Sequence, residues 1–211
     1  MRSFSTIEGR KIRIAVVGCG RISKNHFGSI ETYPDDFELV SVCDNDPEAL
    51  KLATDTYGIK GYLSLTEMLM NEQIDAVSIC TPSGVHPEQT IEIAEAGVHV
   101  ISEKPMATRW NDGVRMVKAC DIAGVRLFVV KQNRRNTTLQ LLKRAMEEKR
   151  FGRVYMVNLN VFWTRPQEYY DQAKWRGTWE LDGGAFMNQA SHYIDLVDWL
   201  IGPVEKVQAM M

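Results

Sequence analysis

No stretch of this 211-residue chain is apolar for long enough to form a membrane helix, which needs about 20 such residues. The N-terminal residues MRSFSTIEGRK are polar and lack the apolar centre of a signal peptide, so we expect a short tail before the first strand. The net charge is -2, and the absence of a basic excess argues against nucleic-acid binding and membrane-surface attachment. No repeat or low-complexity segment is present.

Cysteine is scarce, and the sequence contains no C-x-x-C pair. Three of the four cysteines lie at the ends of expected strands, where small buried side chains are common. This pattern is typical of a reduced, cytoplasmic protein and argues against a disulfide framework. The four residues are Cys19, Cys43, Cys80 and Cys120.

Short apolar runs alternate with amphipathic stretches up to about residue 130. Continuous β-branched runs are typical of strands buried on both faces, and strand–helix alternation predicts a parallel, doubly wound sheet covered by helices. We therefore expect an α/β domain over residues 1–130. The expected strands are KIRIAVVG from Lys11, FELVSVCD from Phe37, IDAVSICTP from Ile74, VHVISEKP from Val98 and RLFVVKQN from Arg126.

Capping signals place the helices between these strands. Asp46 is the expected cap of a helix that has Pro47 in its first turn, and glycines are expected to end two later helices. The expected helices start at about Ile22 and at Pro47, and cover about Pro87 to Ala96, stopped by Gly97, and Trp110 to Ala123, stopped by Gly124.

Residues 131–211 have a different pattern and are expected to form a second domain. An amphipathic helix is predicted over Thr137 to Glu148, and RVYMVNLNVFW alternates as a half-exposed antiparallel strand does. A loop over Thr164 to Gly184 leads to a helix from about Ala185 to Ile201, and VEKVQAMM starts another alternating strand. So few strands rarely make a stable layer. We therefore expect a truncated domain, or one that pairs with another subunit.

The loop VGCGRIS lies between the first strand and the first helix, where a dinucleotide-binding fingerprint is needed. Gly18 would permit the tight turn, and Gly20 would let a pyrophosphate approach the backbone, while Ser23 replaces the third glycine. Arg21 and Ile22 lead into the helix, whose N-terminal N–H groups can bind phosphate. These residues are expected cofactor contacts.

Further candidates follow the second and third of these strands. Asp44 is placed to accept hydrogen bonds from a ribose diol, which favours NAD over NADP, although it could also simply form a turn. Thr81, Pro82 and His86 follow the third strand at the carboxyl edge, where ligands bind in such sheets. His86 could equally cap or pack against its own helix.

Glu103 and Lys104 end the fourth strand at the same edge, where a lysine can contact both the nicotinamide of the cofactor and the substrate, and Pro105 stiffens the turn. Near a carbon that is being oxidised, an ammonium can stabilise the developing alkoxide, and a neutral amine can take the proton of the hydroxyl group.

Asn188, His192 and Asp195 are spaced to share one helical face. A packing role for His192 stays open, and a metal site is disfavoured because no second histidine or cysteine is near. His99 is expected to be structural, and His26 has no evident partner.

The motifs VVGCGRIS, ICTPSGVHPE, SEKPMA and the G-G-x-x-x-[DN]-x-x-x-H element resemble the glucose–fructose oxidoreductase / inositol dehydrogenase / MocA family. The resemblance implies an N-terminal Rossmann domain, then an α+β domain with an open antiparallel sheet through which relatives form tetramers. It also implies that NAD is bound, that Lys104 and His192 are the catalytic pair and that the Lys104–Pro105 bond is cis. Asn188 stands where the family commonly has Asp. The resemblance adds Glu103, Gln132, Trp175 and Arg176 to the cofactor contacts.

Within this family the later segments resemble bacterial dehydrogenases that oxidise the C3 hydroxyl of UDP-N-acetylglucosaminuronic acid for surface polysaccharide (O-antigen, lipopolysaccharide) synthesis. A diphosphate and a carboxylate would suit the basic side chains here. Arg134, Arg165 and Asn188 are expected substrate contacts, together with Lys104 and His192. Three alternatives remain: a dehydrogenase of a free sugar or inositol, a non-catalytic NAD-binding regulator, and an inactive fragment of an active enzyme. The other candidate cations are Lys131, Arg135 and Arg176, with Trp163, Tyr169 and Trp175 as stacking surfaces.

Overall fold

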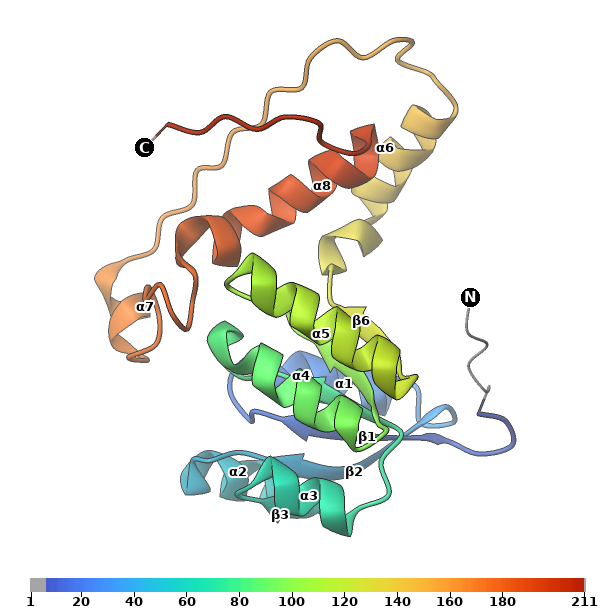
Figure 1. The fold of residues 1–211 in the computed structure, drawn as a ribbon, viewed down its shortest axis with the longest axis vertical. Coiled ribbons are helices and arrows are strands. Elements are labelled where there is room, and N and C mark those ends of the chain that lie inside the picture. The colour runs from blue at the N-terminus through green and yellow to red at the C-terminus, as the bar shows by residue number, and fades with distance from the viewer. Residues whose placement is uncertain (1–6, 211) are drawn as a thin grey trace.

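The computed structural model describes residues 7–210 (Figure 1). The tail expected before the first strand falls partly on residues 1–6, which lie outside the described residues. Met211, at the end of the last expected strand, also lies outside them.

Six parallel strands form one sheet in the order β3-β2-β1-β4-β5-β6, the order of the Rossmann fold. All of them pair in parallel, as the sequence predicts for the first domain. The strands are β1 (Ile12–Val17), β2 (Phe37–Cys43), β3 (Lys60–Tyr62), β4 (Ala76–Ile79), β5 (His99–Ser102) and β6 (Leu127–Val129).

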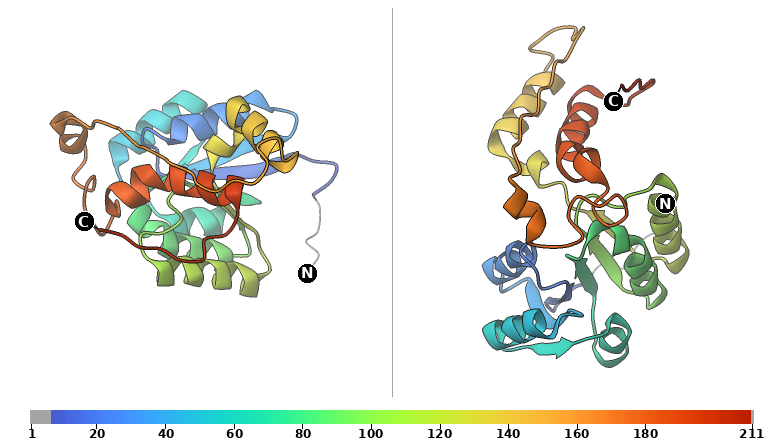
Figure 2. Two further views of the ribbon diagram at one scale, coloured as in Figure 1. Left: turned by 90° about the horizontal axis from the view of Figure 1, so that it is seen from above. Right: turned by 90° about the vertical axis from the view of Figure 1, so that its left-hand side faces the viewer.

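Helices cover both faces of this sheet, because alternate residues of each strand point to opposite sides (Figures 1 and 2). On one face, Val16 of β1 packs with Phe27 of α1 (Ser23–Thr32) and Ala53 of α2 (Pro47–Tyr57). On the other, Val17 packs with side chains of three further helices. These are α3 (Leu65–Asn71), α4 (His86–Glu95) and α5 (Trp110–Ala123). Each large apolar side chain buried in these clusters contributes about 1.5–3 kcal/mol.

Local capping sets the helix ends where the sequence predicts them. The Asp46 side chain accepts a hydrogen bond from the Glu48 N–H at 2.9 Å, which satisfies a free donor at the start of α2. Gly124 ends α5 in the left-handed region at φ 71°. The short strand β3 and helix α3 were not expected from the sequence, because the edge strand KGY carries no apolar run.

Helices are the regular elements of the second part of the chain in the described residues, and long stretches without regular structure connect them. Helices α6 and α8 lie side by side above the sheet (Figures 1 and 2), and Lys143 Nζ donates to the Trp199 carbonyl across them at 2.8 Å. A π-helical turn leads into α8. The elements are η1 (Ser83–Val85), which precedes α4, then η2 (Gln132–Arg135), α6 (Thr137–Glu147), α7 (Gln167–Asp171), η3 (Phe186–Ala190) and α8 (Ser191–Ile201).

The expected open antiparallel sheet does not form in the described residues. The alternating stretch 153–163 runs extended but pairs with no strand, and almost all of it is exposed. The stretch 204–210 likewise forms no strand. An alternating pattern predicts which face a strand would bury, but a strand also needs a partner for its backbone groups. None is present in the part of the chain described here, so both strand predictions are wrong for this structure.

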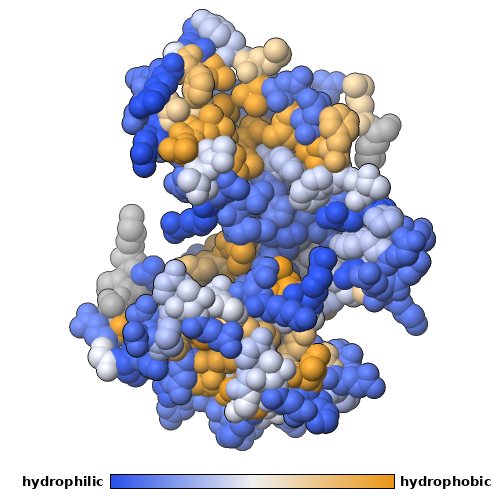
Figure 3. All heavy atoms as spheres, turned by 180° about the vertical axis from the view of Figure 1, so that it is seen from behind, coloured by the Kyte–Doolittle hydropathy of each residue, from blue (hydrophilic) through white to orange (hydrophobic). Residues whose placement is uncertain are grey.

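Apolar side chains reach the surface of the lobe that contains α6 and α8 (Figure 3). Met156, Phe162 and Ile194 are among the large apolar residues that the structure leaves exposed. No helix in the described residues is long and apolar enough to cross a membrane.

Candidate active site

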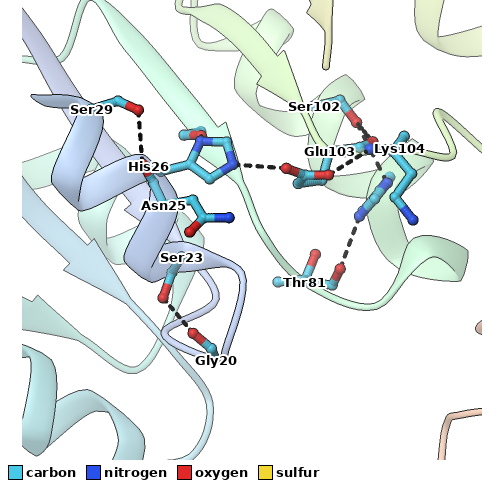
Figure 4. Close-up of polar contacts among 11 residues, drawn as sticks. Gly20, Ser23, Asn25, His26, Ser29, Thr81, Ser102, Glu103 and Lys104 are labelled. Carbon is cyan, nitrogen blue, oxygen red and sulfur yellow. Dashed lines mark hydrogen bonds and ion pairs between the residues drawn. The ribbon is translucent and has the colours of Figure 1, made fainter. Parts of the chain in front are cut away.

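The glycine loop after β1 passes directly across the end of β4. Gly18 has φ 89°, and a Cβ atom there would lie 2.8 Å from the Cys80 carbonyl carbon, so only glycine fits. Beside Gly20, by contrast, a Cβ would meet nothing within 4 Å. The Ser23 hydroxyl donates to the Gly20 carbonyl at 2.6 Å and closes the loop (Figure 4).

The N-terminus of α1 is open to an anion. Its cap residue Ile22 makes no side-chain cap, and the first turn contains no acidic residue, while Arg21 is exposed beside it. Unsatisfied N–H groups and the helix dipole favour negative charge at such an end. The loop and helix therefore fit a dinucleotide pyrophosphate.

Asp44 ends β2 and faces the glycine loop. Its two carboxylate oxygens accept hydrogen bonds from the Cys19 N–H at 2.6 Å and the Asp46 N–H at 2.9 Å. Each oxygen retains further acceptor capacity, since an ionised carboxylate has about four lone-pair sites. Asp44 thus forms the turn, and it can also receive hydroxyl donors.

His86 holds the site together from inside. Its ring is fully buried, with Nε2 2.9 Å from the Thr81 carbonyl and Nδ1 3.0 Å from the Pro105 carbonyl. Burial lowers the pKa of this imidazole. The expected cofactor contact by His86 does not fit this placement, because no part of the ring is accessible. Thr81 and Pro82 remain at the carboxyl edge, where the Thr81 hydroxyl donates to Gln89 Oε1 at 2.6 Å.

Lys104 connects the two parts of the chain. The Lys104–Pro105 bond is cis, as predicted. Lys104 Nζ donates to the backbone carbonyl of Asn188 at 2.9 Å and to its side-chain oxygen at 3.2 Å. The Asn188 amide nitrogen in turn donates to the buried carboxylate of Asp182, which also accepts the Gly177 N–H at 2.8 Å. Asp182 therefore determines which end of the Asn188 amide faces Lys104.

His192 is 6% exposed, and its Nδ1 atom is buried without a hydrogen-bond partner. Burial lowers the pKa of its imidazole, and the positive charges of Lys104 and Lys131 lower it further. Burial also lowers the pKa of Lys104, against the opposing effect of Glu103. Two basic groups with lowered pKa values at one sheet edge are typical of an acid–base site.

Asn188, His192 and Asp195 do not act on one common partner. Asn188 lies in the π-helical turn η3 and faces Lys104. Asp195 lies on α8 and accepts a two-point hydrogen bond from Arg134, at 2.8 and 2.7 Å. Arg134 is thus held by a carboxylate and can offer only its remaining donors to a substrate. Arg134 and Asp195 line a cavity of about 710 Å³. Lys131, whose Nζ lies 3.8 Å from Asp195, and the exposed Gln132 line it too.

The aromatic residues of the loop before η3 hold its arginines. The Arg176 guanidinium lies 4.4 Å from the Tyr169 ring centroid and 5.8 Å from that of Trp175, and it donates to the Tyr169 carbonyl at 2.7 Å. Arg165 lies 5.2 Å from the Trp163 ring and 5.1 Å from Tyr169. Stacking of this kind keeps a cation charged and oriented.

The sequence reasoning missed the partners of His26 and the role of Asp182. His26 contacts Ser78, in β4, and Glu103, which directly follows β5; Figure 4 shows the contact with Glu103. Asp182 was not singled out, although it directly precedes Gly183 and Gly184, a turn that has both φ values positive. Among the described residues no cluster of three or more possible metal ligands occurs.

A Rossmann sheet with a glycine loop, an acidic residue after β2 and a partly buried lysine at its carboxyl edge defines a dinucleotide-binding oxidoreductase. Family comparisons agree. The oxidoreductase family with an NAD-binding Rossmann fold, GFO/IDH/MocA, matches residues 12–131, and the C-terminal domain of the same family matches residues 139–211. The chain belongs to this family.

Curated relatives include sugar and polyol dehydrogenases. The chain is 35% identical over 151 residues to D-apiose dehydrogenase of Paraburkholderia graminis, a match that covers 71% of this chain and 40% of that protein. It is 28% identical to myo-inositol 2-dehydrogenase of Thermotoga maritima, over 94% of this chain and 58% of the relative.

Two solved structures are much more similar. One is the WlbA dehydrogenase of Chromobacterium violaceum, crystallised with NADH and UDP-GlcNAcA, with 68% identity and a TM-score of 0.95. The match covers 97% of this chain and 59% of that one. The other is WlbA of Bordetella pertussis, in complex with the same two molecules, with 67% identity, a TM-score of 0.93 and coverage of 95% and 58%. The chain therefore spans a little over half the length of these proteins.

Proposed function

We propose that this chain carries the NAD site and the catalytic residues of a dehydrogenase that oxidises the C3 hydroxyl of UDP-N-acetylglucosaminuronic acid to the 3-keto sugar. The observation that carries the proposal is the lysine–asparagine–histidine arrangement, in which Asn188 holds Lys104 and the Lys104 charge helps to lower the pKa of His192. High identity to two dehydrogenases solved with NADH and UDP-GlcNAcA supports the substrate.

The two basic residues would divide the acid–base work. His192, whose pKa is lowered by burial, would be neutral at pH 7 and would accept the proton of the C3 hydroxyl. Lys104 donates hydrogen bonds to two oxygens of Asn188. As an ammonium it would also stabilise the negative charge that develops on the C3 oxygen of the substrate. NAD, when bound, supplies the acceptor for the hydride that leaves C3.

The remaining contacts follow from position. The loop residues Gly18, Gly20, Arg21 and Ile22 would hold the pyrophosphate, and Asp44 the adenosine ribose. Thr81, Pro82, Glu103, Gln132, Trp175 and Arg176 are the other proposed cofactor contacts. Arg134 and Arg165 are proposed to bind the negative groups of the sugar nucleotide, together with Asn188.

The wider setting is also proposed. We expect a division into domains near residue 130, a cytoplasmic tetramer and a role in bacterial surface polysaccharide synthesis. The four free thiols fit a reducing compartment. An open antiparallel sheet in the second domain would require strands to pair with the extended segment 153–163.

The decisive experiment is to mix the chain with NAD and UDP-N-acetylglucosaminuronic acid and to follow the absorbance of reduced nicotinamide. Turnover is expected in the wild type and should disappear in Lys104→Ala and His192→Ala, both of which should still bind NAD. Full activity in either variant would contradict the assignment. The relatives that act on free sugars and polyols motivate a parallel assay with D-apiose and myo-inositol. Faster turnover of these would favour that alternative, whereas NAD binding without any turnover would favour a regulatory role.

A further inference from the structure

His26 lies on the helix that follows the glycine loop, yet its ring points across the sheet edge toward β5 (Figure 4). Its Nδ1 atom is 2.7 Å from the Ser78 hydroxyl on β4, and its Nε2 atom is 3.0 Å from Glu103 Oε1. The second oxygen of Glu103 accepts the backbone N–H of Lys104 at 3.0 Å. One continuous chain of hydrogen bonds thus connects α1, the helix that follows the glycine loop, to Lys104.

The chemistry of these groups determines the direction of the bonds. Burial raises the pKa of Glu103, but hydrogen bonds from His26 and the Lys104 N–H outweigh it, and the net pKa lies below the ordinary value. Glu103 is therefore an ionised carboxylate, which only accepts hydrogen bonds. Nε2 of His26 must then carry a hydrogen and donate a hydrogen bond to Glu103. Both Glu103 oxygens are oriented by donors from opposite sides.

We propose that His26 is a positioning residue of the oxidation reaction. Through Glu103 it holds the Lys104 backbone, and so the ammonium, at a constant place relative to α1 and the dinucleotide. The inference rests on the proposed function, because it assigns a consequence to the placement of Lys104. His26 itself touches neither Lys104 nor any other proposed acid–base group.

Two variants distinguish the roles of the two ring nitrogens of His26. In His26→Gln the side-chain amide can replace Nε2 and still donate to Glu103. In His26→Asn the shorter amide can replace only Nδ1 and keeps the Ser78 contact. His99→Asn is the matched control, since His99 begins β5 at the opposite end, where its Nδ1 accepts the Arg126 N–H at 3.1 Å.

Two readouts are needed, and the first requires no substrate. Exchange of the Lys104 amide hydrogen should accelerate about tenfold or more in His26→Asn, as expected for one weakened hydrogen bond to a charged group. It should stay near the wild-type rate in His26→Gln and in the His99 control. In turnover of UDP-N-acetylglucosaminuronic acid, kcat of His26→Asn should fall about 100-fold, the size expected for a misplacement of about 1 Å, with little change in KM for NAD. His26→Gln should restore kcat.

Unchanged amide exchange in His26→Asn would overturn the proposal, whatever the activity. Equal loss of kcat in both His26 variants would overturn it too, because a merely structural residue would not distinguish them. If the wild type turns over no substrate, the proposed function fails, and the exchange experiment alone decides the role of His26. If His26→Asn does not fold, Glu103→Leu replaces it, since its side chain has no acceptor for the Lys104 N–H. Unchanged Lys104 exchange in that variant would equally refute the proposal.

Discussion

The buried contact between Asp182 and Asn188 explains why an amide, and not a second carboxylate, stands beside Lys104. Asp182 is 4% exposed and accepts hydrogen bonds from the Asn188 amide and the Gly177 N–H. Asn188→Asp would remove the amide donor and bring two carboxylates into contact. Loss of a hydrogen bond to a charged group costs about 1.5–3 kcal/mol. An ion pair between the new carboxylate and Lys104 would offset only part of this.

We expect a net loss of about 2 kcal/mol in Asn188→Asp, which for a chain of this length lowers Tm by about 4–8 °C. The double variant Asp182→Asn with Asn188→Asp should recover most of it, because the amide and the carboxylate then exchange places and every partner is satisfied. The assay is thermal unfolding of both single variants and the double variant, read as a double-mutant cycle.

Asn160→Asp, in the exposed extended segment, makes the same chemical change and should leave Tm nearly unchanged. A Tm of Asn188→Asp equal to that of the wild type would refute the reasoning. So would a double variant no more stable than Asn188→Asp alone.

Three further predictions concern stability and are checked by chemical or thermal unfolding. Gly84→Ala should destabilise by about 1–3 kcal/mol, because its Cβ would collide with the backbone of the neighbouring loop, whereas Gly28→Ala, with open space inside α1, should stabilise by up to about 1 kcal/mol. Comparable losses in both would contradict this. The folded state lowers the pKa of His192, so its contribution is present above the unfolded value of about 6.5 and is lost as pH falls below it. The free energy of unfolding of the wild type relative to His192→Gln should therefore decrease as the pH falls from about 7.5 to about 5. A difference that does not change with pH would show that folding does not lower the pKa of His192. Asp46→Ala should cost about 1 kcal/mol through loss of the cap of α2, with Asp46→Asn nearly neutral as its control. An unchanged midpoint in the alanine variant would show that the cap contributes nothing.

Most of the Rossmann sheet could be predicted because its information is local. A strand buried on both faces, such as Ile12–Val17, must be apolar throughout, and a helix that ends at Gly124 needs a left-handed residue there. The segment 153–163 shows the limit of the same reasoning. Its alternating side chains satisfy the pattern of a strand, but the backbone pairs with no strand in the described residues.

The candidate site divides in the same way. Parallel strands place their carboxyl ends at one edge, so Gly18, Asp44 and Lys104 could be brought together from the sequence alone. The partners of these residues could not. Glu103 is 77 residues from His26, and Lys104 is 84 residues from Asn188, and no spacing rule reaches that far.

The sequence by itself determined the Rossmann fold of the first part of the chain, the sheet edge at which the candidate site residues gather and their residue types. Periodicity, capping and the order of strands depend on neighbours along the chain, and those neighbours are visible in the sequence. Only the tertiary structure decided which groups are free to react. His86 has suitable chemistry, but its two ring nitrogens contact the carbonyls of Thr81 and Pro105, and Asp195 takes two of the donors of Arg134. A side chain's availability depends on what folds against it, and that is a property of three-dimensional packing.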